Sequence, residues 1–157
     1  MQVNPVKTMA DAMEALGESR AELLDAIEDL PDEARDGDRW HGDWTVKDIV
    51  CHIAAWEESF SLALDATATD GLFERPASHD APAEFNERTA HAYHFADWED
   101  AEDFLDEARQ LLMSAMLDCI TLPPEIQATL ADELTIEAAH EAEHARAIEA
   151  WRKERGL

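Results

Sequence analysis

The sequence predicts an all-α protein built as a bundle of four long helices. Apolar residues recur at steps of three and four through most of the chain, which is the period of an amphipathic helix. No segment shows the alternating apolar pattern of a β-strand bounded by turns, and no internal repeat has a fixed period. A chain of 157 residues is long enough to bury one core, so residues 1–157 are expected to form a single domain.

The first helix is expected to begin near Asn4 and Pro5, because Asn is a favoured cap and Pro fits the first turn. Its apolar stripe runs from Val6 to Leu30. Arg20 falls on the same stripe, so its guanidinium must reach solvent, find a carboxylate or enter a pocket. The turn-rich segment PDEARDGDRWHGDW ends this helix.

A second helix is expected to start after Thr45, which with Asp48 three residues later has the pattern of a capping box. The connection over residues 67–82 is longer than most helix connections, and loops of this length often border a site. A shorter helical stretch around Phe85 leads to a third long helix, for which Asp97 is the expected cap.

The last helix is expected to run from about Asp132 or Thr135 to Arg155, with Gly156 placed to terminate it. The segment TLPPEIQ interrupts the helical pattern before this point. Four long helices therefore carry the predicted fold.

The charge of the chain excludes several kinds of partner. It has 37 acidic residues against 12 basic ones, for a formal net charge of −25. Nucleic acid and anionic membrane surfaces would be repelled, because both are bound through clusters of Lys and Arg. We therefore expect small-molecule or protein partners. The acidity fits either a surface adapted to high salt or a very soluble protein, and scarce lysine favours the first.

A cytoplasmic protein without disulfides is expected. Cys51 and Cys119 each lie inside an apolar periodic segment, as buried thiols do. The segment MQVNPVKTMADAM has no signal-peptide character, and no stretch approaches the 18 consecutive apolar residues of a membrane span.

Three histidines are the candidate functional residues. His140 and His144 are four residues apart, so on a helix they share a face and can hold one metal ion. They lie on a line from Ile136 to Trp151 that we expect to face the core, and His52 lies beside the apolar face of its own helix. One metal would satisfy all three buried imidazoles, whereas the alternative is three separately hydrogen-bonded core histidines.

Two other metal sites match the residues around HEAEH less well. The zinc peptidase pattern H-E-x-x-H would make Glu141 a general base, but no downstream ligand follows and no strand is available to bind a peptide. Glu-x-x-His elements of dinuclear sites occur at Glu137 and Glu141, but both lie on one helix, and Ile49 stands where the second helix would need a glutamate. A mononuclear site fits better.

The surroundings of the histidines are also open to two readings. Trp44 and Trp56 bracket His52, and Trp151 lies seven residues beyond His144, so they are expected to pack in the core or to wall a pocket. The remaining histidines are expected to be surface or loop residues: His41, His79, His91 and His94.

With the histidines placed, the segments WTVKDIVCHIAAWEE and HEAEHARAIEAWR give the chain its resemblance to the DinB-like superfamily. The resemblance covers nearly the whole chain, and FNER and EHARAIEAWR are similar to the ClbS and DfsB branch. It implies a DinB-like four-helix bundle with a long crossover between helices 2 and 3. It also implies metal ligands at His52, His140 and His144, and a homodimer.

The function implied is a metal-dependent enzyme that acts on a small electrophilic molecule, by thiol transfer or hydrolysis, in stress or detoxification. Zinc or nickel is the expected metal, with a low-molecular-weight thiol as a candidate cosubstrate. Glu141 or Glu143 would orient a ligand or carry a proton. The alternatives are a bundle that binds or sequesters a small molecule without turnover, and a bundle in which the histidines are structural.

Overall fold

Every regular element is helical in the computed structural model, which describes residues 6–37 and 44–157. The four long helices are α1 (Met9–Ile27), α2 (Val46–Asp70), α4 (Trp98–Asp118) and α5 (Pro124–Arg155). The shorter elements are the π-helical turn η1 (Glu33–Gly37), the 3-10 turn η2 (Ala77–His79) and α3 (Pro82–Ala92). The predicted all-α four-helix bundle is confirmed.

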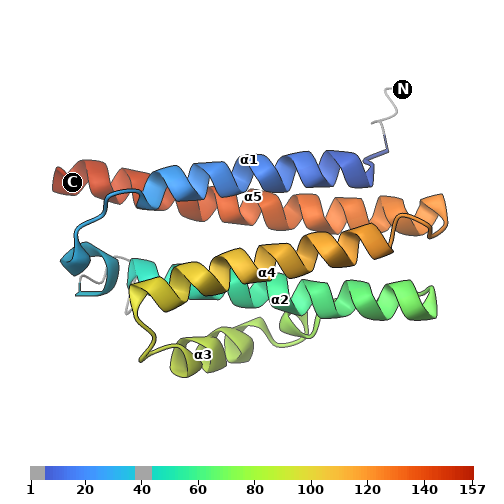
Figure 1. Ribbon diagram of the computed structural model, residues 1–157, viewed down its shortest axis with the longest axis horizontal. Helices are drawn as coiled ribbons and strands as arrows, with labels where there is room; N and C mark the ends of the chain where they lie inside the picture. The colour runs from blue at the N-terminus through green and yellow to red at the C-terminus, as the bar shows by residue number, and fades with distance from the viewer. Residues whose placement is uncertain (1–5, 38–43) are drawn as a thin grey trace.

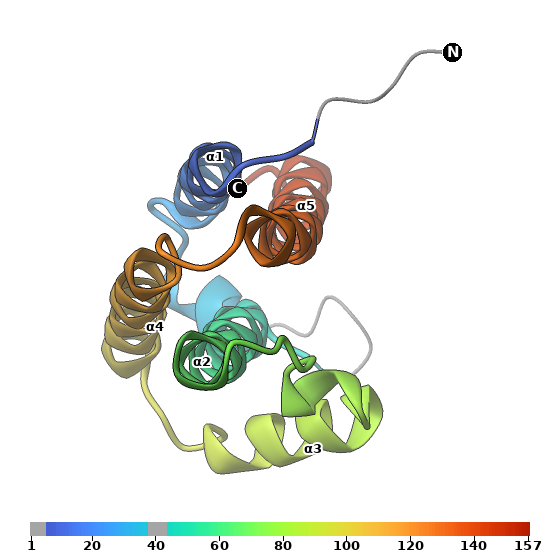
Figure 2. The same cartoon turned by 90° about the vertical axis from the view of Figure 1, so that its right-hand side faces the viewer.

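The long helices form two pairs. The helices within each pair are parallel, and the two pairs are antiparallel to each other. α1 lies along α5 and α2 lies along α4, and the end-on view shows the four helices at the corners of the bundle (Figures 1 and 2). Because α2 and α4 run the same way, the chain must return along the bundle between them. Residues 71–97 make this return and carry η2 and α3 against the outer side of α2 (Figure 2). This is the predicted crossover between the second and third long helices.

Capping boxes fix the starts of three long helices. At Thr45 and Asp48 each side chain bonds the other's backbone N–H, as the sequence predicts, and Asp97 with Asp100 does the same before α4. α1 begins at Met9 after a third box made by Thr8 and Asp11. The predicted start near residues 4 and 5 was therefore too early, and Asn4 and Pro5 themselves lie outside the described residues.

α5 begins at Pro124, well before the predicted start at Asp132 or Thr135. The segment TLPPEIQ interrupts the helical pattern only up to Pro123, the N-cap. Pro124 is tolerated as the first helical residue because it lacks only an N–H that would have no intrahelical partner. The other end follows the prediction: Gly156 adopts a left-handed conformation with φ of 68° and terminates the helix.

The core consists of two hydrophobic clusters separated by a layer of charged residues. One cluster is centred on the first half of α2 and the end of α1, and it includes Leu23, Ile49 and Ile148. The other fills the opposite end of the bundle and includes Phe60 and Leu112. Between them lie the buried or nearly buried side chains of the charged layer, Arg20, Glu57, Arg109, Glu137 and Glu141, together with the hydroxyl of Ser19.

None of the helices in residues 6–37 and 44–157 combines the length and the apolar character needed to span a bilayer.

Candidate metal centre

The structure brings the three predicted histidines together between α2 and α5. One ring nitrogen from each of His52, His140 and His144 lies within 4.8 Å of the other two. The rings of His140 and His144 are centred 4.5 Å apart, and the ring of His52 stands nearly perpendicular to both, at 5.7 Å and 5.3 Å. Three imidazoles that converge on one point are a donor set suited to zinc, nickel or a similar divalent ion.

His140 and His144 lie at the edge of the buried face of α5 rather than in its middle. Ile136, which the sequence places on the same inward line, is 64% exposed. The buried stripe instead passes through Leu134, Glu137, Glu141 and Ile148. The face that the sequence predicted to be buried is therefore rotated about the helix axis from the face that is buried. Both histidines are half-buried in consequence, so a ligand held by them would remain accessible from outside the core.

Aromatic rings flank His52 on both sides. The rings of Trp44 and Trp56 are centred 5.3 Å and 5.9 Å from its imidazole, and Trp56 also lies 6.2 Å from His140. The indole N–H of Trp56 donates a 2.7 Å hydrogen bond to Asn86 Oδ1 on α3, which ties the crossover to the site. Trp151 packs against the hydrophobic cluster that includes Ile148, and the Arg155 guanidinium lies over its ring.

His79 is closer to this site than its loop position predicts. It is half-buried at the end of η2, with its ring 4.9 Å from Trp56 and 5.5 Å from Phe60. The expected surface histidines His91 and His94 are exposed, and His41 lies outside the described residues. The crossover thus supplies a second layer of rings behind Trp56.

The protonation states of the histidines fit a metal site. Burial lowers the pKa of His52 to about 3, with further lowering from the charges of His144 and His140 and an opposing interaction with Asn86. Burial also lowers the pKa of His140, against the charge of Glu143, which raises it. The neutral imidazoles favoured here are the form that ligates metals. In addition, His52 Nδ1 is buried without a hydrogen-bond partner, a demand that a metal ion or a ligand would meet.

A buried ion cluster lies next to the histidines. Glu141, adjacent in sequence to His140, accepts hydrogen bonds from Ser19 Oγ at 2.6 Å, Arg20 Nε at 2.9 Å and Arg109 Nη2 at 3.1 Å. Glu57, on the same helix as His52, accepts hydrogen bonds at Oε1 from both arginines. The contacts of Glu141 occupy the carboxylate that the sequence suggested as a proton carrier.

Of this cluster, the sequence singled out Arg20, for which it left three outcomes open; the structure shows that the guanidinium finds carboxylates. Arg109 and Glu57 were not noticed. Both interrupt an apolar stripe, since apolar residues precede each by four positions and follow each by three. A charged residue in that position on several helices is a usable signal for a buried ion cluster, because each must find a partner inside the bundle.

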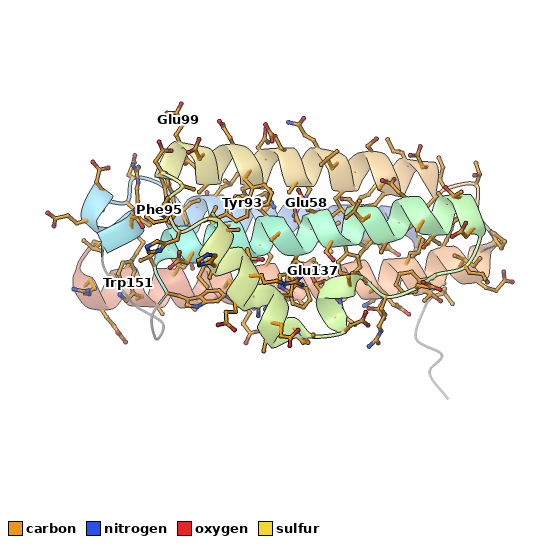
Figure 3. All side chains as sticks on the ribbon, turned by 90° about the horizontal axis from the view of Figure 1, so that it is seen from below. Glu58, Tyr93, Phe95, Glu99, Glu137 and Trp151 are labelled. Atoms are coloured by element: carbon orange, nitrogen blue, oxygen red, sulfur yellow. The ribbon has the colours of Figure 1, made fainter. Side chains whose placement is uncertain are left out.

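Glu137 is a buried carboxyl group that makes no ion pair with an arginine in the described part of the chain. It lies midway along the bundle between α2 and α5 (Figure 3) and is 8% exposed. Burial raises the pKa of Glu137 to about 8, and the charges of Glu57 and Glu141 add to this, whereas Arg109 opposes it. Its location one turn before His140 places an uncharged acid beside the histidines.

A four-helix bundle with a crossover between its second and third long helices, and a histidine cluster between its second and last long helices, defines the DinB-like class. The chain belongs to the family described as the mycothiol maleylpyruvate isomerase N-terminal domain, whose model matches residues 16–116. The matched segment contains His52, Glu57 and both arginines of the ion cluster. His140 and His144 lie beyond it and join the site through the fold.

The solved structures include a similar fold. A crystal structure of an uncharacterised protein from Escherichia coli UTI89 matches with a TM-score of 0.73 and 15% sequence identity, over 96% of each chain. At that identity the match shows the fold alone. The curated proteins contain no match to this sequence.

Proposed function

We propose that the protein is a metal-dependent enzyme that joins a small electrophilic molecule to a nucleophile, either a low-molecular-weight thiol or water. The observation that carries the proposal is the convergence of His52, His140 and His144 in a chain of this family. Zinc and nickel suit three imidazole ligands. When bound, such an ion would act as a Lewis acid that favours the thiolate or hydroxide form of the nucleophile.

The residues of the chain supply the rest of the site. His140 and His144 offer two nitrogens from one helix, and His52 offers the third from across the bundle. Trp44 and Trp56 exclude water from the His52 side and offer apolar surface to a substrate. Because both histidines of α5 are half-buried, a substrate approaching from outside the core could reach an ion held by them.

A thiol cosubstrate is the first nucleophile to consider, and the name of the family points to mycothiol as the thiol to test. The protein's own thiols are poorly suited to the task. Cys51 and Cys119 are fully buried, and burial raises the pKa of both. A nucleophilic sulfur would therefore have to come from a separate molecule.

The two glutamates expected to carry protons have different surroundings. Glu141 is held by Ser19, Arg20 and Arg109, so we assign it a positioning role. Glu143 is exposed on α5 and lies close enough to His140 to raise its pKa. Glu143 is therefore the better candidate to exchange protons with a bound nucleophile.

The similarity to the ClbS and DfsB branch supports a second candidate reaction, in which water rather than a thiol opens the electrophile. A third candidate is a binding protein that holds the small molecule at the same three histidines without turnover. A cytoplasmic homodimer remains part of the proposal.

The proposal is tested first by the metal content of protein purified without a polyhistidine tag. One zinc or nickel per chain is expected, and His52→Ala should bind the ion more weakly, through the histidine pair of α5 alone. A folded protein that takes up neither zinc, nickel, manganese nor iron would eliminate the metal centre.

The reaction is tested by incubating the metal-loaded protein with mycothiol or glutathione and a panel of epoxide, cyclopropane and unsaturated carbonyl compounds. Mass spectrometry separates a thiol adduct, which gains the mass of the thiol, from a hydrolysis product, which gains the mass of water. Product in excess of the enzyme, absent with His52→Ala, indicates catalysis. Capture of no more than one equivalent per chain supports the binding protein instead.

A further inference from the structure

The residues Arg20, Glu57, Arg109 and Glu141 form a closed ion cluster with one member on each long helix, here called the four-helix clamp. The arginines come from α1 and α4, and the glutamates come from α2 and α5, the two helices that carry the histidines. Each arginine contacts both glutamates. The formal charges balance, two positive against two negative.

We propose that the four-helix clamp fixes the separation of α2 and α5 and thereby decides whether His52 can share one metal ion with His140 and His144. The inference rests on the metal centre proposed above. It assigns to Arg20 and Arg109 the role of positioning residues, which act through Glu57 and Glu141 and not on the substrate.

Each arginine of the clamp connects α2 to α5 by hydrogen bonds to a glutamate of each helix. Arg20 donates from Nη2 to Glu57 Oε1 at 3.0 Å and from Nε to Glu141 Oε2 at 2.9 Å. Arg109 donates from Nη2 to Oε1 of both glutamates. A planar guanidinium with donors in a rigid fork sets the spacing of two carboxylates more strictly than a flexible ammonium.

The arginines are themselves anchored to the backbone. Arg20 Nη1 donates to the carbonyl of Leu105 on α4 at 3.2 Å, and Arg109 Nη1 donates to the carbonyl of Leu16 on α1 at 2.7 Å. Each arginine therefore also ties α1 to α4. The clamp therefore joins the two helix pairs twice, by linking α2 to α5 and by linking α1 to α4.

This connection matters because the ligand-bearing helices belong to different pairs. α5 packs along α1 and α2 packs along α4, whereas α2 and α5 come close at few positions (Figure 2). His140 and His144 keep their spacing through the geometry of α5 alone. The distance from them to His52 depends on how the two pairs pack against each other, and the clamp joins the two pairs through ion pairs.

The clamp lies close enough to the ligands to transmit a displacement. Glu141 follows His140 directly, and Glu57 follows His52 by five residues, about 7.5 Å along a helix at 1.5 Å per residue. Metal–nitrogen distances tolerate only about 0.2 Å of variation. A shift of α2 against α5 by about 1 Å would therefore remove His52 from the coordination sphere, although the pair on α5 would still bind.

Stability alone gives a weak reason for such a cluster in a core. Apolar residues of similar volume are often neutral or stabilising replacements for buried ion pairs. The two hydrophobic clusters on either side already hold the bundle together. The best-attested use of buried polar groups is to set the register between helices, and this is the role that we assign to the clamp at the level of the histidines.

The test uses the double variant Glu57→Met/Arg109→Met, which removes the clamp side chains of α2 and α4 and leaves the Arg20–Glu141 pair charge-balanced. Zinc X-ray absorption counts the imidazole ligands, and a chelator competition gives the affinity. We expect three imidazoles in the wild type and two in the variant, with affinity lower by about 10- to 100-fold.

Two further variants separate positioning from stability. Leu64→Ala creates a cavity on α2 in the hydrophobic cluster remote from the site, so it should destabilise the fold but keep three imidazoles and wild-type affinity. Arg109→Lys keeps the charge but cannot bridge both carboxylates in the same way, so it should weaken zinc binding with a smaller effect than the double variant. It also serves as the test if the double variant does not fold.

The possible results have distinct meanings. Three imidazoles with unchanged affinity in a folded clamp variant would overturn the positioning role and leave the metal centre intact. Equal loss of affinity in Leu64→Ala would overturn it too, since any destabilisation would then suffice. A wild-type protein that binds no zinc or nickel would instead overturn the proposed function on which the inference rests.

Discussion

The Nε2 atoms of His140 and His144 lie 3.0 Å apart on successive turns of α5. Two imidazole nitrogens bound to one tetrahedral zinc at about 2.0 to 2.1 Å would be separated by about 3.3 Å. The pair is therefore close to the spacing that an ion requires before any ion is bound. Without a metal, one Nε2 must carry a proton and donate a hydrogen bond to the other Nε2.

Replacement of His144 by alanine should therefore lower zinc affinity by at least about 100-fold, because a chelating pair becomes a single ligand. Isothermal titration of the metal-free protein measures the change. His94→Ala is the matched control, since His94 is exposed on the crossover and should leave the affinity unaltered. Unchanged affinity in His144→Ala would show that zinc binds elsewhere.

The two thiols should be unreactive in the folded protein. Burial raises the pKa of Cys51 to about 12, and it also raises the pKa of Cys119, so burial disfavours the reactive thiolate of both. Ellman's reagent should detect no reactive thiol in the native protein within minutes, and it should detect two thiols per chain in guanidinium chloride. Rapid reaction of the native protein would restore an internal sulfur nucleophile as a candidate.

The sequence predicted the parts of the structure that depend on local patterns. The steps of three and four located the four long helices, and the Thr45 and Asp97 caps were placed correctly. The inward positions of His52, His140 and His144 predicted that the three side chains cluster, as they do. Each of these follows from the geometry of one helix, or from the requirement that buried imidazoles find a partner.

What the sequence left out depends on contacts across the bundle. Periodicity indicates that Glu57 and Arg109 face inward, but not that they meet, because helix register and pairing are set by the whole core. Ile136 was placed on the inward line because it lies four residues before His140, whereas the buried stripe set by packing against α1 includes Glu137 and Glu141, which a search for apolar residues passes over. Pro124 was treated as a break because its tolerance depends on its place in the helix.

The capping box at the start of α2 should contribute measurably to stability. Thr45→Ala removes the hydroxyl that accepts from the Asp48 backbone N–H, and we expect a loss of about 1 kcal/mol in the free energy of unfolding. Urea denaturation with an unchanged m value measures it. Thr69→Ala, at an exposed hydroxyl near the other end of α2, should change stability by less than about 0.5 kcal/mol.

Asn86 should hold α3 against the site. In Asn86→Leu the indole N–H of Trp56 loses its acceptor, which should cost about 1 to 3 kcal/mol. Hydrogen exchange should accelerate in the amides of α3 and η2 and stay unchanged in α1. Glu87→Gln, at an exposed neighbouring position, is the control. Unaltered exchange in α3 of the Asn86 variant would show that other contacts fix the crossover.

Glu137 should make the stability of the metal-free protein fall with rising pH. Its pKa is raised to about 8 in the folded state, from 4.5 for an ordinary glutamate, chiefly by burial. Below pH 4.5 both states hold the proton and the group has no effect. Between pH 4.5 and 8 the unfolded state releases its proton while the folded state keeps it, so the unfolded state binds fewer protons and stability decreases.

Glu137→Gln removes this titration while it preserves the shape of the side chain. The variant should therefore gain stability relative to the wild type as pH rises from 4.5 to 8, by on the order of 1 kcal/mol per pH unit at most, and the difference should level off above pH 8. Urea denaturation in the presence of EDTA at several pH values measures it, with the exposed Glu149→Gln as control. A constant difference across this range would show that Glu137 is ionised in the folded protein, which would require a cation or an ordered water network beside it.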